Sequence, residues 1–200
     1  LLLDDDVIIK NNIFSETNKN LSDDDLFYYG NVLIHGTKNH YVRYFVTNND
    51  INLWNYNRIC SVSLIINRNV FDKIGLFDEN LGAGSNFGSS EESDFILRAL
   101  LSKIKIKYLK NYVVYHSLAI HSLSKVETYA MGGGALHRKY ISRLNFYLYF
   151  NFLIDLTLRI IFLFTFQIKR YIFLRGFFKG FIKFGDYKWE LIFYITSRKF

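Results

Sequence analysis

The fold is decided by the stretch Ile59–Leu100, ICSVSLIINRNVFDKIGLFDENLGAGSNFGSSEESDFILRAL. Its first part, Ile59–Asn67, is apolar and rich in Ile and Val, which predicts a buried strand. The part that follows predicts a short helix over Asn69–Gly75, with Asn69 as the N-cap and Gly75 as the C-terminal stop. A buried strand followed at once by a helix is typical of an α/β domain.

A second helix is predicted after the segment Leu81–Ser90, whose glycine and serine content predicts a flexible loop. The helix is indicated by apolar residues at helical spacing, namely Phe95, Ile96, Ala99 and Leu100. Glu91 and Asp94 have a structural explanation, because acids in the first turn of a helix meet its dipole favourably. The preceding loop allows a functional explanation of these acids as well. It would let a substrate approach the helix N-terminus past Gly84, where Glu92 could take a proton from a hydroxyl.

Short apolar runs elsewhere predict the other strands. They are rich in Tyr, Val, Ile and Phe, namely Leu1–Leu3, Val7–Ile9, Leu26–Gly36, Tyr41–Thr47, Ile104–Leu109 and Tyr112–His116. Strands that alternate with helices indicate a Rossmann-like α/β fold with a mixed sheet. Because a strand running straight into an acidic turn is an unusual start for a domain, we expect that an N-terminal half precedes Leu1.

The acidic turn is the triplet Asp4-Asp5-Asp6, between two predicted strands. In α/β sheets the carboxyl ends of strands commonly form the ligand crevice, and carboxylates there suit Mg²⁺ or Mn²⁺ shared with a diphosphate. The alternative is a solvated acidic turn, since the chain has a similar triplet at Asp23–Asp25. His116 ends an apolar strand and is either a structural histidine or the imidazole that completes a metal site.

Composition narrows the function classes. The chain carries a formal net charge of +7, and its cations concentrate in the C-terminal third among Phe, Leu and Ile. This arrangement fits an anionic membrane surface rather than a nucleic-acid groove. Cys60 is the one cysteine, which excludes an intrachain disulfide and a cysteine-rich zinc site. Gly-x-Gly-x-x-Gly, Walker and Gly-x-Ser-x-Gly motifs do not occur.

The C-terminal third predicts membrane attachment. Met131–Gly134 indicates a hinge, and the apolar segment Leu144–Phe166 is about the length that spans a bilayer. The segment Tyr171–Phe184 mixes cations with Phe, Leu and Ile, as interfacial helices do, and its Gly176 and Gly180 permit a close helix–helix approach. The alternative is a pair of buried helices in a soluble oligomer. We therefore expect three regions: a catalytic domain over residues 1–123, a glycine-containing hinge and helix over 124–143, and a membrane-associated helical tail over 144–200.

In their order, these features resemble family 2 glycosyltransferases of the GT-A type. In that family a DxD-type metal motif precedes the pattern R..F..IG.FDE.LG.G, a Glu-Asp-x-Asp helix start and a terminal His. This chain has Asp4-Asp5-Asp6, then RNVFDKIGLFDENLGAG over Arg68–Gly84, then EESD over Glu91–Asp94, and then His116. The resemblance covers roughly Leu1–His116 and, more loosely, the hydrophobic tail. It implies the C-terminal portion of a membrane-associated, bacterial-type member.

The resemblance also implies roles for individual residues. Asp6 would ligate a divalent metal, Mg²⁺ or Mn²⁺, and His116 would contact the metal or the diphosphate. Asp4 would support the metal or, together with Asp5, contact the sugar nucleotide. Glu92 stands where the family has its catalytic base.

Three further residues are candidates. The catalytic base of the family is usually Asp, so Asp94 remains the alternative base. Arg98 would stabilise its helix or contact a phosphate. Trp54, in a polar loop, is a candidate for stacking on a sugar ring.

The function expected from this resemblance is sugar transfer from a nucleotide-sugar donor to a glycan or lipid-linked acceptor. We expect inversion at the anomeric carbon, a place in cell-surface polysaccharide synthesis, and a membrane-associated protein with its catalytic domain on the cytoplasmic face. Nucleic acid is not an expected partner. Two alternatives stay open: a metal-dependent hydrolase or phosphotransferase that uses the same acids, and a non-catalytic membrane-interaction protein in which the acids serve only as turns and caps.

Overall fold

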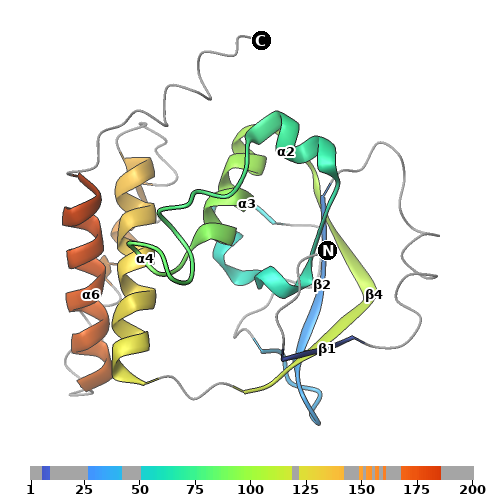
Figure 1. The fold of residues 1–200 in the computed structure, drawn as a ribbon, viewed down its shortest axis with the longest axis horizontal. Coiled ribbons are helices and arrows are strands. Elements are labelled where there is room, and N and C mark those ends of the chain that lie inside the picture. Colours follow the sequence, from blue (N-terminus) through green and yellow to red (C-terminus); the bar gives the residue numbers. More distant parts are fainter. Residues whose placement is uncertain are drawn as a thin grey trace. The chain divides into compact units, whose positions relative to one another are not determined.

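The computed structural model describes residues 6–9, 27–41, 51–118, 122–141, 149–150, 152–154, 156–157, 160 and 168–185 (Figure 1). The chain divides into two compact units. The first, which we call the sheet unit, comprises Leu1–Leu76 and Phe95–Ile120; the second, the helical unit, comprises Phe77–Asp94 and His121–Phe200. Helix α3 (Glu91–Leu101) contributes its first turn to the helical unit and the rest to the sheet unit.

The sheet unit contains a four-stranded mixed sheet with the order β1-β4-β2-β3. Its strands are β1 (Val7–Ile9), β2 (Phe27–Ile34), β3 (Leu64–Ile66) and β4 (Ile106–His116). The central strands β2 and β4 run parallel, while β1 and β3 add antiparallel at the two edges. The predicted α/β class with a mixed sheet is thereby confirmed. The predicted strand Leu1–Leu3 and nearly all of Tyr41–Thr47 lie outside the described residues.

The two strands predicted at Ile104–Leu109 and Tyr112–His116 form a single strand, β4, in the structure. The sequence predicted a break between Leu109 and Tyr112, but the structure has a continuous strand with an irregularity at that point, where the register against β2 shifts. The irregularity has a steric cause. The Tyr112 ring lies so close to the backbone of Gly30 in β2 that a Cβ at Gly30 would overlap it. The exposed pair Lys110 and Asn111, which suggested a turn, belongs to this bulge.

Ile59–Asn67 is less regular than its composition predicted. A 3₁₀ turn over Ser61–Ser63 precedes a strand of three residues, β3. The Ser63 hydroxyl donates to the Cys60 carbonyl at 2.8 Å, a local bond that competes with the strand ladder. The prediction of one long strand was therefore wrong.

Helix α2 (Arg68–Ile74) starts earlier than predicted. The Asn67 carboxamide accepts a hydrogen bond from the Asn69 backbone N–H at 3.0 Å, so Asn67 and not Asn69 is the N-cap. The predicted stop at Gly75 is confirmed. Gly75 has a φ of 79°, and its N–H donates to the Phe71 carbonyl.

Aromatic packing joins α3 to the sheet and to α2 within the sheet unit. The Phe95 ring lies 5.9 Å from Phe27 of β2 and 5.0 Å from Phe71 of α2, measured between ring centroids. Phe27 and Phe95 are fully buried. A separate cluster around Val32, Val62 and Val114 fills the space beside β2 and β4.

The helical unit is built on α4 (Leu123–Ile141) and α6 (Ile168–Gly185), which lie side by side (Figure 1). The sequence predicted a hinge at Met131–Gly134, but these residues lie inside α4. Glycines there serve close packing instead. A Cβ at Gly134 would overlap the Phe177 carbonyl of α6, and a Cβ at Gly180 would overlap the Met131 carbonyl of α4. The predicted close approach at Gly176 and Gly180 is confirmed.

This packing predicts opposite effects for two adjacent glycines. Gly134→Ala should destabilise the helical unit by about 1–3 kcal/mol, because its methyl group has no room against Phe177. Gly133→Ala should stabilise it by up to about 1 kcal/mol, because a Cβ there meets only one ring atom, at 4.0 Å, and Ala favours the helix. Urea denaturation of both variants checks this. Equal effects of the two substitutions would contradict the close approach.

The helix predicted at Tyr171–Phe184 is confirmed as α6. Within the described ranges, no helix is both long enough and apolar enough to cross a bilayer. Most of the predicted spanning segment Leu144–Phe166 lies outside those ranges. The predicted boundary at residue 123 falls close to the start of α4, while the compact units divide the chain differently, because Phe77–Asp94 belongs with the helical unit.

Candidate functional site

Two residues predicted to share a metal lie next to each other in the sheet unit. Strands β1 and β4 pair antiparallel with Val7 opposite His116. This register places Asp6, which precedes β1, beside the end of β4. The Asp6 Oδ1 and His116 Nε2 atoms are 3.5 Å apart. The Asp6 side chain is about half exposed and the His116 side chain is largely buried, so the pair opens to solvent on the carboxylate side.

The orientation of the His116 ring is fixed by its other nitrogen. Nδ1 lies 2.7 Å from the Ser117 carbonyl oxygen, and because a carbonyl can only accept, Nδ1 carries the proton of that bond. The Tyr41 ring packs against the imidazole with 4.3 Å between centroids. Nε2 is thereby directed to Asp6. Metal-binding imidazoles are commonly held in this manner by a backbone carbonyl on the second nitrogen.

The chemistry of this pair fits a divalent cation. An imidazole nitrogen and a carboxylate oxygen that face each other repel unless a proton or a cation lies between them. Carboxylate oxygen suits Mg²⁺ and Mn²⁺, and imidazole adds affinity for the transition metals. Among the described residues no group of three or more His, Cys, Asp or Glu forms a potential metal site. The other two acids of the predicted triplet, Asp4 and Asp5, lie outside the part of the chain that the structure describes.

The glycine-rich loop of the helical unit is tied together by Ser85. The Ser85 hydroxyl lies 2.8 Å from the Asn80 carbonyl and 2.7 Å from the Gly82 carbonyl, and it accepts a hydrogen bond from the Gly88 N–H at 3.0 Å. The loop was predicted to be flexible, but these bonds connect its two ends. Gly84 has a φ of 81°, is exposed, and has no atom within 4 Å of the position that a Cβ would take. A substrate could therefore approach the backbone closely at Gly84.

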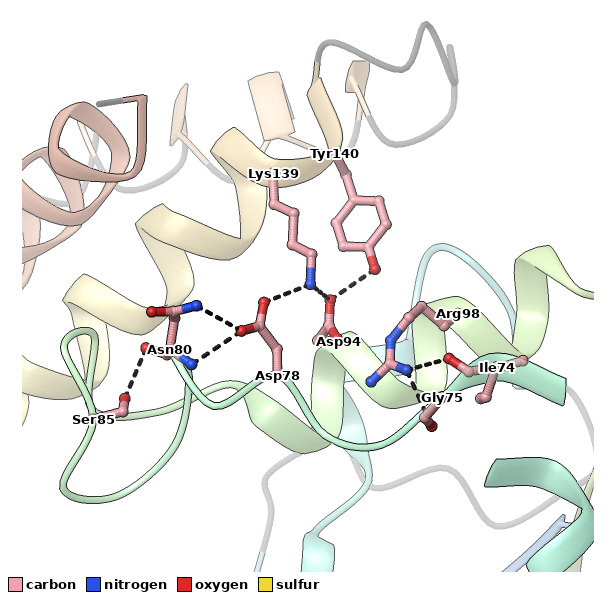
Figure 2. A network of polar contacts seen from close by, with 9 residues as sticks. All are labelled: Ile74, Gly75, Asp78, Asn80, Ser85, Asp94, Arg98, Lys139 and Tyr140. Atoms are coloured by element: carbon pink, nitrogen blue, oxygen red, sulfur yellow. Dashed lines mark hydrogen bonds and ion pairs between the residues drawn. The ribbon is translucent and has the colours of Figure 1, made fainter. Parts of the chain in front are cut away.

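The loop is anchored by a buried cluster of charges (Figure 2). The Lys139 ammonium of α4 lies 2.8 Å from Asp78 Oδ2 and 2.6 Å from Asp94 Oδ1. The Tyr140 hydroxyl donates to the same Asp94 oxygen at 2.7 Å. Asp94 is fully buried, and Asp78 and Lys139 nearly so. One cation thus pairs with two carboxylates, one from the loop and one from the first turn of α3.

The pKa of Asp78 reflects this environment. Burial on its own would raise the pKa of the carboxyl. The Lys139 ammonium, with hydrogen bonds from Lys139 and Asn80, outweighs that effect and holds the pKa below its ordinary value. Asp78 Oδ1 accepts from both the backbone and the side-chain nitrogen of Asn80, at 3.0 and 3.1 Å. Asp78 is therefore a charged, buried anchor of the loop.

The two candidates for the catalytic base occupy different environments. Asp94 is enclosed, with Lys139 and Tyr140 on its carboxylate. A carboxylate held in this way has little access to a substrate hydroxyl. Glu92, two residues earlier, is partly exposed. Its neighbour Glu91 packs against Gly82 of the loop. Glu92 is therefore the more accessible of the two carboxylates.

Two further predicted substrate residues have contrasting positions in the sheet unit. Arg98 is buried, and its guanidinium donates to the backbone carbonyl of Ile74, with that of Gly75 3.4 Å away (Figure 2). It thus stabilises the C-terminal end of α2 and not, as the sequence had suggested, its own helix α3. Trp54 is 42% exposed, so its ring is accessible for the predicted stacking on a sugar.

Sequence reasoning missed Lys139, Tyr140 and Asp78. Lys139 lies 61 residues from Asp78 and 45 from Asp94 in the chain, and no local pattern connects charges at such separations. Lys139 itself gave no distinctive signal, because it directly follows His137 and Arg138 in the chain.

Comparisons of the chain with protein-family models, with curated proteins and with solved structures gave no match.

Proposed function

We propose that the chain is the catalytic part of a metal-dependent glycosyltransferase with a GT-A type of fold. The reaction is the transfer of a sugar from a nucleotide-sugar donor to a hydroxyl of a glycan or lipid-linked acceptor. The proposal takes its reaction class from the motif order of the sequence, and the mixed α/β architecture is compatible with it.

The observation that carries the proposal is the pairing of Asp6 with His116. These residues are 110 positions apart, and their 3.5 Å separation was no part of the motif resemblance that nominated both as metal ligands. The Asp6 carboxylate faces the imidazole, as two ligands of a shared cation would. We propose that Asp6 and His116 Nε2 hold Mg²⁺ or Mn²⁺, and that Asp4 and Asp5 assist with the metal and the sugar nucleotide.

The proposed reaction uses one carboxylate base. An acceptor hydroxyl attacks the anomeric carbon, a new C–O bond forms, and the bond from that carbon to the diphosphate oxygen breaks. Glu92 accepts the hydroxyl proton, and the electron pair leaves with the diphosphate. A divalent cation bound at Asp6 would neutralise the charge that develops on the diphosphate. A single displacement inverts the configuration at the anomeric carbon.

Metal binding tests the first half of the proposal. In Asp6→Asn and in His116→Ala, the affinity for Mn²⁺ should fall at least about tenfold, the lower end of what even an outer-shell change costs. Electron paramagnetic resonance of free Mn²⁺ measures this without any turnover. Asp72→Asn, an exposed carboxylate of α2, is the matched control and should bind normally. Unchanged Mn²⁺ affinity in Asp6→Asn would remove the proposed site.

Turnover tests the second half. The longest expressible form of the protein is incubated with common nucleotide sugars, Mn²⁺ or Mg²⁺, and candidate acceptors, and the product's anomeric configuration is determined. Metal-dependent formation of an inverted glycoside supports the proposal. Release of phosphate from simple phosphate esters without an acceptor would instead support a hydrolase.

A further inference from the structure

The exposed face of α6 combines apolar and cationic side chains. Four large apolar residues of this helix are between 42% and 67% exposed, namely Ile168, Tyr171, Phe178 and Ile182. Their spacing of three, seven and four residues places them on one side of the helix. The opposite side, with Phe177, Gly180 and Phe184, is buried. An apolar stripe that faces water indicates a partner for that side.

Exposed apolar side chains are concentrated in this part of the chain. Of the 16 large hydrophobic residues that are exposed in the described ranges, nine lie between Tyr149 and Ile182. Isolated exposed hydrophobics need no explanation, but such a concentration does.

The net positive charge of the chain is concentrated on helices α4 and α6. Helix α4 has three Lys or Arg residues and one acid, Glu127, while α6 has five Lys or Arg residues and no acid. Their sum, +7, equals the formal net charge of all 200 residues. The rest of the chain is therefore neutral as a whole, so the net positive charge resides on this helix pair.

The cations stand beside the apolar stripe. Arg175 and Lys179 are more than half exposed, and helical spacing places Lys183 next to Lys179 on the same side. Glu127 accepts a hydrogen bond from Arg175 at 2.6 Å and lies 3.9 Å from Lys179. Glu127 is the one acid of α4, whereas α6 carries five Lys or Arg residues and no acid.

We infer that this face of α6 docks onto the surface of an anionic lipid bilayer, with α6 lying in the interface. A helix with an apolar stripe bordered by Lys and Arg inserts its apolar side chains at the level of the acyl boundary, while its cations contact lipid phosphates. The charge decides between a membrane and a second copy of the chain. Two copies would bring two strongly cationic faces together, whereas an anionic bilayer complements them. This inference stands independently of the proposed reaction.

Co-sedimentation with vesicles tests the docking. The chain should bind vesicles of phosphatidylcholine that contain phosphatidylglycerol, bind phosphatidylcholine alone far more weakly, and be released by salt. The double substitution Lys179→Gln with Lys183→Gln should weaken binding roughly thirtyfold, since each cation near such a surface contributes about 1 kcal/mol. The matched control, Lys38→Gln with Lys73→Gln in the sheet unit, removes the same charge and should leave binding nearly unchanged.

The apolar stripe is tested in parallel. Phe178→Ser with Ile182→Ser should weaken binding by about tenfold or more, because both side chains lose their burial in the interface. Leu76→Ser with Leu118→Ser, two equally exposed positions of the sheet unit, is the control. All four pairs change exposed side chains, and circular dichroism verifies that each variant is folded. Equal losses in test and control pairs would overturn the inference. So would a dimer, measured by sedimentation, that the α6 substitutions dissociate without affecting vesicle binding.

Discussion

Lys139→Met should lower the free energy of unfolding by about 3–5 kcal/mol, a large share of the stability of an ordinary domain. The reason is the charge balance of the buried cluster. Lys139 is within 2.8 Å of both carboxylates, and its removal leaves Asp78 and Asp94 buried without their cation. Urea denaturation measures the effect. Lys125→Met, the same substitution at an exposed position of α4, is the control and should change stability by about 0.5 kcal/mol or less.

A triple variant separates the effect of charge from the effect of packing. If the loss arises from unpaired carboxylates, adding Asp78→Asn and Asp94→Asn to Lys139→Met should restore part of the stability. A triple variant less stable than Lys139→Met alone would show that packing around the lysine stem dominates.

The pH dependence should reverse sign in the same variant. Because folding lowers the pKa of Asp78, its contribution in the parent is fully present above the ordinary carboxyl pKa of about 4 and is lost as the pH falls through the folded-state value. Without Lys139, burial remains as the largest single cause and raises the pKa, opposed only by the hydrogen bonds from Asn80. The variant should therefore gain stability as the pH falls from about 7 to about 5, where the parent stays nearly constant.

Glu92→Gln should reduce the rate of glycosyl transfer by about 10²–10⁴, the usual contribution of a positioned general base. Mn²⁺ affinity should stay unchanged, because the proposed ligands are Asp6 and His116. The loss should appear in kcat, since the substitution keeps the size of the side chain and its capacity for hydrogen bonds. Initial-rate kinetics at saturating donor measure it.

Glu91→Gln and Asp94→Asn are the comparisons that decide between the neighbouring acids. Glu91→Gln should retain most of the activity, since Glu91 packs against Gly82. Asp94→Asn should lower stability, because it disturbs the contacts with Lys139 and Tyr140. Full activity in Glu92→Gln, together with a kcat loss in a still-folded Asp94→Asn protein, would assign the base to Asp94.

Local signals allowed much of the sheet unit to be predicted. The apolar run of β2 and the glycine stop of α2 were recognisable because each depends on residues adjacent in the chain. The failures occurred where a distant contact changed the local outcome. Strand β4 looked like two strands because the sequence does not show that Tyr112 lies against Gly30.

The helical unit illustrates the same limit. The small residues Gly176 and Gly180 indicated close packing, and they do face α4. Gly132–Gly134 resembled a hinge because three consecutive glycines favour one locally. Neighbouring backbones at Ser89 and Phe177, however, occupy the space that side chains at Gly132 and Gly134 would need. The ion cluster at Lys139 was beyond prediction, since it joins segments remote in the chain.

The Ser85 hydroxyl connects Asn80, Gly82 and Gly88 by hydrogen bonds within the loop itself. Fixing the backbone of one residue costs about 1–2 kcal/mol in conformational entropy, and here folding has already ordered these residues. A ligand that reaches Gly84 would meet a preorganised surface and would lose little affinity to ordering the loop. Its association should therefore resemble the docking of rigid partners, with slow dissociation set by contacts and no folding step coupled to binding.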